Sequence, residues 1–149
     1  MKKHPAKTTQ IVNRRANFDY KLGDKLIVGM VLAGNEVRAA RDNHISLKGA
    51  FVTIRNQELW LNNASFTLKN IKDSGTTVST NPRKLLATKR QISELLKQKQ
   101  AGMTIVPTRM LTSGRHIKLE IAVGAGKKLY DKRQDIKKRD IERETRRFY

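Results

Sequence analysis

The strongest constraint on the fold is a regular alternation of side chains along residues 50–68. Phe51 and Thr53 face one side of an extended chain, and Val52 faces the other. A period of two is typical of a β-strand with one covered face. A turn at Asn56–Gln57 then reverses the chain, so the stretch predicts a β-hairpin.

Two further stretches predict strands. Residues 103–111 and 115–123 join through Thr112–Gly114 and predict a second hairpin. Residues 25–32 form a short apolar run rich in β-branched side chains, which predicts a buried strand. Gly29 within this run indicates a bulge or a close approach of another segment.

Helices are expected between these strands. Residues 33–43 predict a short helix capped by Asn35, and residues 82–102 predict an amphipathic helix that begins at Pro82. Residues 70–82 are rich in Ser, Thr, Asn and Gly and predict a long, mobile loop. The predicted class is therefore mainly β: an oligonucleotide-binding-type antiparallel β-barrel with flanking helices.

The net charge points to a polyanionic partner. The chain carries a formal charge of +19 with a pI of about 10.7, and the part before residue 126 alone keeps +14. Phosphates neutralise such a field, so nucleic acid is the leading partner. Aromatic residues make up only 5% of the chain, which favours structured RNA read by shape over bases read by stacking.

A membrane partner is disfavoured. No stretch approaches the roughly 18 apolar residues of a spanning helix. The basic start "MKKHPAK" is not followed by the apolar core of a signal peptide. We therefore expect a cytoplasmic protein, and its high charge favours a monomer.

The sequence predicts no catalytic, metal or cofactor site. The stretch "GAGKK" at 124–128 lacks the first glycine and the final Ser or Thr of a phosphate-binding loop. His4, His44 and His116 have no metal-ligand spacing, there is no cysteine, and the carboxylates are scattered. The chain is predicted not to be an enzyme.

Trp60 and Phe51 have two possible roles. As strand residues they could stack on bases, as aromatic platforms do in oligonucleotide-binding barrels. Core packing is favoured for Trp60, because large aromatic side chains are usually mostly buried.

The C-terminal segment, unlike the predicted barrel, has too few apolar side chains to form a core. Residues 126–147 contain ten Lys or Arg, but their only aliphatic side chains are Leu129, Ile136 and Ile141. A helix with so little to pack is expected to fray alone and to form against a partner.

The predicted organisation has two parts. Residues 1–125 form a basic RNA-binding β-barrel domain that begins with a flexible arm at 1–12. Residues 126–149 form a tail that is disordered alone and becomes helical on its partner.

Four blocks in order carry a resemblance to a known family: "NRRANFDY" (13–20), "GMVLAGNEVRAAR" (29–41), "NPRKLLATKRQI" (81–92) and "GKKLYDKRQDIKKRD" (126–140). From about residue 13 to 140 the chain resembles the SmpB family of SsrA-binding proteins. The resemblance implies binding to the tRNA-like domain of transfer-messenger RNA (tmRNA) and its delivery to stalled ribosomes for trans-translation.

The resemblance also implies which residues make contact. The expected RNA-binding residues, with two from the basic face of the predicted helix, are Asn13, Arg14, Arg15, Glu36, Arg38, Lys84, Leu86, Lys89 and Arg90. The expected ribosome-binding residues of the tail are Lys127, Lys128, Tyr130, Asp131, Lys132, Arg133, Ile136, Lys137, Lys138 and Arg139.

The resemblance implies that the tail enters the vacant messenger channel of a stalled ribosome, where its cations meet ribosomal RNA. Tyr130 would stack on a base of the small-subunit decoding centre, and Ile136 would dock apolar surface. For Glu36 and Leu86 a purely structural role is equally open. The chain departs from the family pattern at Ile27, where a glutamate is usual.

Two alternatives remain open. The first is a basic structural protein of the ribosome that binds ribosomal RNA. The second, an RNA-modifying or RNA-cleaving enzyme, is supported only by the charge.

Overall fold

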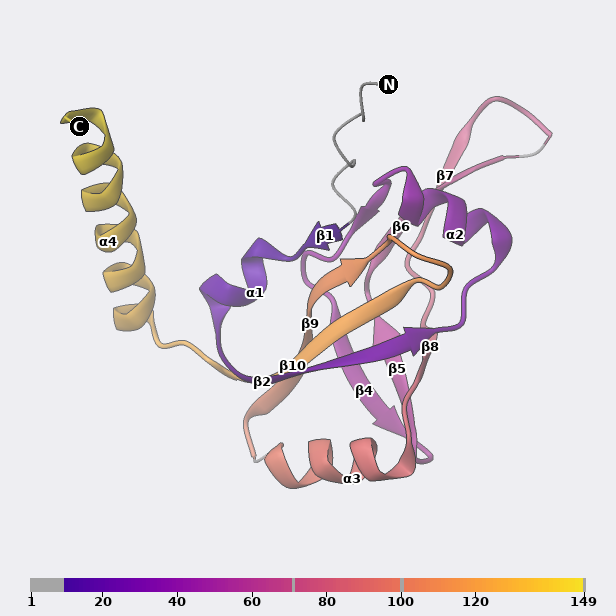
Figure 1. Cartoon of the computed structure of the whole chain (residues 1–149), viewed down its shortest axis with the longest axis horizontal. Coiled ribbons are helices and arrows are strands. Elements are labelled where there is room, and N and C mark those ends of the chain that lie inside the picture. Colours follow the sequence, from indigo (N-terminus) through magenta and orange to yellow (C-terminus); the bar gives the residue numbers. More distant parts are fainter. Residues whose placement is uncertain (1–9, 71, 100, 149) are drawn as a thin grey trace, which may run out of the picture.

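A six-stranded antiparallel barrel forms the body of the protein (Figure 1). The computed structural model describes residues 10–70, 72–99 and 101–148. Around the barrel the strands are β9 (Met103–Leu111), β10 (Lys118–Gly126), β2 (Tyr20–Met30), β8 (Arg83–Leu86), β5 (Glu58–Asn62) and β4 (Phe51–Arg55). The ring closes where β4 pairs with β9 through Val52 and Ile105. The predicted mainly-β barrel is confirmed.

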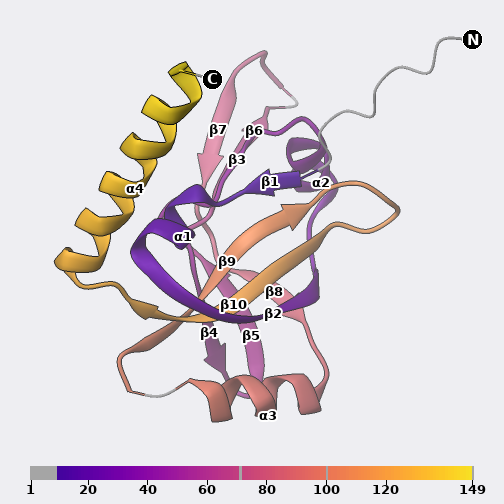
Figure 2. The same cartoon turned by 60° about the vertical axis from the view of Figure 1, so that its left-hand side comes forward.

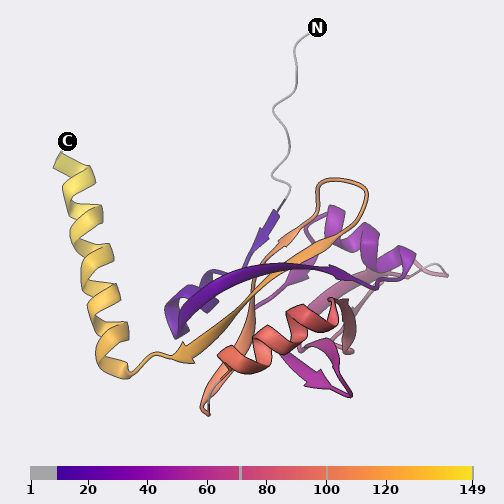
Figure 3. The same ribbon diagram turned by 60° about the horizontal axis from the view of Figure 1, so that its bottom comes forward.

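The remaining elements flank this barrel. The other strands are β1 (Gln10–Val12), which pairs with β9, and β3 (Ile45–Ser46), β6 (Ser65–Lys69) and β7 (Thr76–Ser79), which form a separate sheet. The helices are α1 (Arg14–Asp19), α2 (Gly34–Arg41), α3 (Lys89–Gln98) and α4 (Leu129–Phe148). α3 lies across one end of the barrel, whereas α4 stands beside it (Figures 1 and 3). Among the described residues, no helix is both long and apolar enough to cross a membrane.

The core follows from the alternation in the strands. Leu59 and Leu61 on β5 are fully buried, and Trp60 between them lies half-buried on the outer face. The expectation of core packing for Trp60 is therefore wrong, because its register places it outside. The turn at Asn56–Gln57 has positive φ at both residues, 51° and 62°, as a two-residue hairpin turn requires. Both predicted hairpins are confirmed, although β10 begins at Lys118.

The segment predicted as one helix over 82–102 is a strand followed by a shorter helix. Leu85 is buried because β8 pairs with both β5 and β2. α3 begins only after Thr88, whose hydroxyl accepts the Gln91 N–H while the Gln91 side chain accepts the Thr88 N–H. This capping box gives the helix a start signal six residues later than Pro82.

Three other expectations need correction. Thr76–Ser79 of the predicted 70–82 loop pairs with β6, so the loop is shorter than expected, and its mobility stays a prediction. Ala33, not Asn35, precedes α2, and Glu36 Oε1 accepts the Ala33 N–H at 3.1 Å. In the predicted arm at 1–12, residues Gln10–Val12 form β1, because they pair with β9. Residues 1–9 lie outside the described part.

The predicted strand at 25–32 is longer and less buried than expected. It begins at Tyr20, and Val28 is its one fully buried side chain. The predicted close approach at Gly29 is confirmed: a Cβ there would lie 3.3 Å from Leu86 Cβ.

Glu120 on β10 joins the strands by a buried polar network. Its side chain is 4% exposed and accepts from Arg109 Nε at 2.5 Å and from Thr108 Oγ1 at 3.0 Å. Arg109 also donates to Gln10 Oε1 at 2.9 Å, which ties in β1. Burial alone would raise the pKa of Glu120, but the hydrogen bonds from Arg109 and Thr108 and the charge of Arg109 hold this pKa below its usual 4.5.

We predict that Glu120→Gln lowers the free energy of unfolding at pH 7 by about 1–3 kcal/mol, because a charged hydrogen-bond acceptor is lost. A depressed pKa stabilises the fold above pH 4.5, and this stabilisation disappears as the pH falls below that value. The difference in free energy of unfolding between the variant and the parent protein should therefore shrink in acid. Urea unfolding between pH 7 and pH 3 measures it, with the exposed Glu94→Gln as control. A difference independent of pH would contradict the assignment.

Candidate nucleic-acid interface

Glu36 and Arg83 form a buried link between α2 and β8. The Arg83 side chain is 5% exposed, and its Nε lies 2.5 Å from Glu36 Oε2. Its guanidinium stacks 3.8 Å from the centre of the Phe66 ring and also donates to Asn81 O and Ser79 Oγ. Since Glu36 also caps α2, both of its oxygens are engaged within the protein. Glu36 therefore has a structural role: it fixes α2 against β8.

Sequence reasoning missed Arg83. It lies in the "NPRKLL" block, but one arginine is inconspicuous in a chain with 32 Lys and Arg. The signal that could have found it is the alternation along β8, where Arg83 and Leu85 face inward.

Lys84 and Leu86 face outward from the same strand. Lys84 Nζ lies 3.2 Å from Glu58 Oε1, an exposed pair, and Leu86 is 52% exposed. Lys89 and Arg90 begin α3 and have no ion-pair partner among the residues that the structure describes. A cavity of about 480 Å³ lies between the β4–β5 turn, β8 and the start of α3, and Lys84, Leu86 and Lys89 line it. The structure thus brings these three predicted residues together.

Arg38 lies on the exposed side of α2. It lines a cleft of about 500 Å³ with Lys69 and His44, between α2 and β6. Neither Arg38 nor Lys69 has an ion-pair partner in the described part of the chain. Both cations are therefore available to an anionic ligand.

Asn13, Arg14 and Arg15 lie in a different region, at the start of α1. Asn13 is 5% exposed; its side chain donates to Pro107 O at 2.8 Å and its N–H to Thr108 O at 2.8 Å. Asn13 therefore anchors α1 on β9, and its amide is already engaged. Arg14 and Arg15 are exposed, and Arg15 pairs with Asp19 at 3.2 Å.

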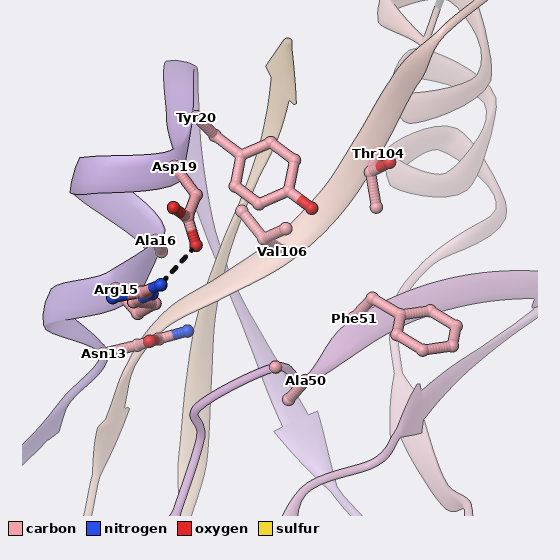
Figure 4. Close-up of a pocket in the computed structure, with 10 residues that line it drawn as sticks. Asn13, Arg15, Ala16, Asp19, Tyr20, Ala50, Phe51, Thr104 and Val106 are labelled. Atoms are coloured by element: carbon pink, nitrogen blue, oxygen red, sulfur yellow. Dashed lines mark ion pairs between the residues drawn. The ribbon is translucent and has the colours of Figure 1, made fainter. Parts of the chain in front are cut away.

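A pocket of about 320 Å³ lies beside this anchor (Figure 4). The Arg15–Asp19 pair forms one side, and the hydroxyl of Tyr20 is turned toward Thr104 on β9. Phe51, at the start of β4, lies at the far side and is 39% exposed.

The tail forms α4, which meets the body at α1 (Figure 2). Lys132 Nζ lies 3.3 Å from Asp19 Oδ1, and Lys21 Nζ lies 3.7 Å from Asp131 Oδ2. Arg139 and Lys132 lie 5.5 Å and 5.9 Å from the centre of the Phe18 ring, within the range of cation–π contact. The attachment of α4 is therefore electrostatic.

Just before α4, Lys127 forms an ion pair with Asp135 of that helix. The hydrogen bond from Lys127 lowers the pKa of Asp135 below its usual value, and the charge of Lys127 acts in the same direction. Lys128, Arg133, Lys137 and Lys138 have no ion-pair partner in the described residues. Tyr130 is 69% and Ile136 48% exposed, so neither side chain is buried against the body. The disorder of the tail alone stays a prediction.

The described residues contain no group of three or more metal-ligating side chains that could hold a metal ion. The closed barrel and the exposed cations on two sides of it define a basic β-barrel protein of the nucleic-acid-binding class.

Comparison with known proteins agrees with this class. Residues 10–149 match the SmpB protein family. The SsrA-binding protein of Oleidesulfovibrio alaskensis is 42% identical over 139 residues, which are 91% of this chain and 88% of that protein. The SsrA-binding protein of Coprothermobacter proteolyticus is 42% identical over 138 residues, covering 91% of this chain and 92% of the relative. The chain belongs to the SmpB family.

A solved structure supports the same assignment. One chain of the structure described as "tmRNA-SmpB: a journey to the center of the bacterial ribosome" superposes with a TM-score of 0.67 and 28% identity. The match covers 82% of this chain and 87% of that one.

We predict that Asp19→Asn releases α4 from α1, because it weakens the ion pair that joins Asp19 to Lys132 of α4. The chain has no cysteine, so two cysteines introduced into one chain, by Ser93→Cys and Thr145→Cys, can carry a fluorescent donor and acceptor. Energy transfer at low salt should be lower in the variant than in the parent protein. Asp24→Asn, on the neighbouring strand β2, is the matched control. Equal transfer in all three proteins would show that Asp19 does not hold the helix.

Proposed function

We propose that this protein binds the tRNA-like domain of tmRNA and acts with it on the ribosome in trans-translation. Membership of the SmpB family over residues 10–149 is the observation that carries this proposal. The family consists of RNA-binding proteins without enzymatic activity. The unpaired cations on opposite sides of the barrel suit a protein that contacts RNA in two places.

We assign the two regions to two partners. The side formed by α2, β8 and the start of α3 contacts tmRNA through Arg38, Lys84, Leu86, Lys89 and Arg90. This side is supported by Arg83, because its link to Glu36 fixes α2 against the strand. Arg14 and Arg15 on α1 extend the RNA contact toward the tail.

The tail is the ribosome-binding part. Its cations meet ribosomal RNA in the vacant messenger channel, Tyr130 stacks on a decoding-centre base, and Ile136 docks there. The high exposure of both apolar side chains supports this assignment. This activity places the protein in the cytoplasm, and its charge favours a monomer.

We propose that the boundary between barrel and tail lies slightly later than residue 126. Gly126 still pairs with Tyr20 on β2, and the Lys127 N–H donates to Asp19 O at 2.8 Å. We therefore place the tail after Lys127.

We predict that a chain ending at Lys127 keeps its affinity for the tRNA-like domain of tmRNA but loses rescue, because the barrel and its cations remain intact. The measurement is a salt titration of binding with ordinary tRNA as competitor, beside a tagging assay on stalled ribosomes. A chain that ends earlier, at Val123, would also lose residues 124–126 of β10, which pair with β2, and would not test the tail alone. Loss of RNA binding in the Lys127 truncation would refute the division of labour.

We predict that Tyr130→Ala leaves tmRNA binding unchanged and blocks tagging, because the phenol ring is exposed and acts only at the ribosome. Leu129→Ala removes the neighbouring exposed side chain and serves as the control. Tagging at the parent rate by Tyr130→Ala would contradict the role.

The alternative of a structural ribosomal protein is separated by sedimentation. The rescue function predicts enrichment on ribosomes with truncated messengers, whereas a structural protein would occupy all ribosomes equally.

A further inference from the structure

The outer face of β5 and β8 carries an aromatic side chain next to a cation. Trp60 stands on the outside of the barrel between the fully buried Leu59 and Leu61. Its cross-strand partners are Thr53 on β4 and Lys84 on β8. The indole therefore lies in a row between a hydroxyl group and an ammonium group.

The outer face is also exposed at the next outward-facing position of β8, Leu86. Leu86 lies two residues after Lys84, on the same side of β8, and is 52% exposed. Its partner on β2 is Gly29, which has no side chain to cover it. Ile27, two residues before Gly29, is 47% exposed. The outer wall formed by Trp60, Lys84 and Leu86 thus continues into exposed apolar surface on β2.

We infer that this outer wall takes one unpaired base of the bound RNA. The base stacks on Trp60, and the adjoining phosphates contact Lys84 and Lys89. The inference rests on the proposed function and names which part of the RNA the wall receives. It also gives the single tryptophan a role that neither core packing nor the cationic surface provides.

The chemistry of the wall favours a base over other ligands. Indole stacks on any base, and such a contact is sequence-tolerant. A paired base in an A-form helix offers no free face, so the ligand must be unpaired. The cations around the wall and the +14 charge of the barrel domain favour RNA over an apolar protein partner. The exposed pair with Glu58 holds Lys84 beside Trp60 and leaves its other donors free.

The protein carries its own probe for this contact. Trp60 is the only tryptophan, so its emission reports on this wall alone. We expect addition of the tRNA-like domain of tmRNA to the full chain to quench this emission, with a midpoint equal to that of RNA binding measured by anisotropy of labelled RNA.

Substitutions separate stacking from charge. Trp60→Leu should weaken binding about 5- to 150-fold without changing the salt dependence, the loss expected for one stacked base. Trp60→Phe should retain most of the affinity. Lys84→Gln should instead reduce the salt slope by about one phosphate contact. Val78→Ala, at an exposed apolar residue of β7 outside this wall, is the control and should leave binding unchanged.

The outcomes distinguish the two proposals. Saturating RNA binding with unchanged tryptophan emission would overturn the stacking site and leave the proposed function standing. Quenching by a protein partner but not by RNA would also overturn it. Failure of the RNA to bind at all would refute the proposed function, and the site with it. If Trp60→Leu proves unstable, Trp60→Phe and the emission of the parent protein still decide the question.

Discussion

Closure of the barrel depends on a change of direction in β9. Pro107 has no N–H to donate, and the register with β10 shifts between Glu120 and Ile121. The bulge lies at Thr108, whose carbonyl accepts from Asn13 and whose hydroxyl donates to Glu120. A bulge of this kind bends a strand and increases its twist. One half of β9 can therefore pair with β4 while the other half pairs with β1.

Two groups of residues can be distinguished on the closed barrel. One group anchors the helices on the strands, and the other is exposed to solvent. Asn13, Glu36 and Arg83 make hydrogen bonds within the protein that fix α1 and α2 on the strands. Arg38 on α2 and Lys84 on β8 face outward from the same helix and strand. Because the Glu36–Arg83 link fixes α2 on β8, the backbones that carry Arg38 and Lys84 keep their relative positions, which suits the proposed recognition of RNA by shape. Asn13 and Glu36, both expected at the RNA surface, are thus engaged within the protein, and their part in RNA binding stays a prediction.

The sequence predicted the strands in which buried and exposed side chains alternate over enough residues to be recognised. Both hairpins alternate over five or more residues per strand, so their pairing was foreseeable. β8 was not, because four residues show little alternation and Leu85 also fits the helical spacing to Ile92. Pairing with β5 and β2 decided the outcome, and such tertiary contacts override local propensity. Likewise, no pattern shows that Glu36 faces Arg83, 47 residues away.

The attachment of α4 also lay beyond sequence reasoning, and its weakness suits the proposed function. Leu129, Ile136 and Ile141 are all exposed, so none of these side chains is buried to hold the helix on the barrel. Partly exposed ion pairs contribute only about 0–1 kcal/mol each, and salt screens them. Lys132 and Arg139 can therefore leave Asp19 and Phe18 when ribosomal phosphates compete. A tail packed by a hydrophobic face would remain on the barrel, whereas one held by charge can transfer to RNA.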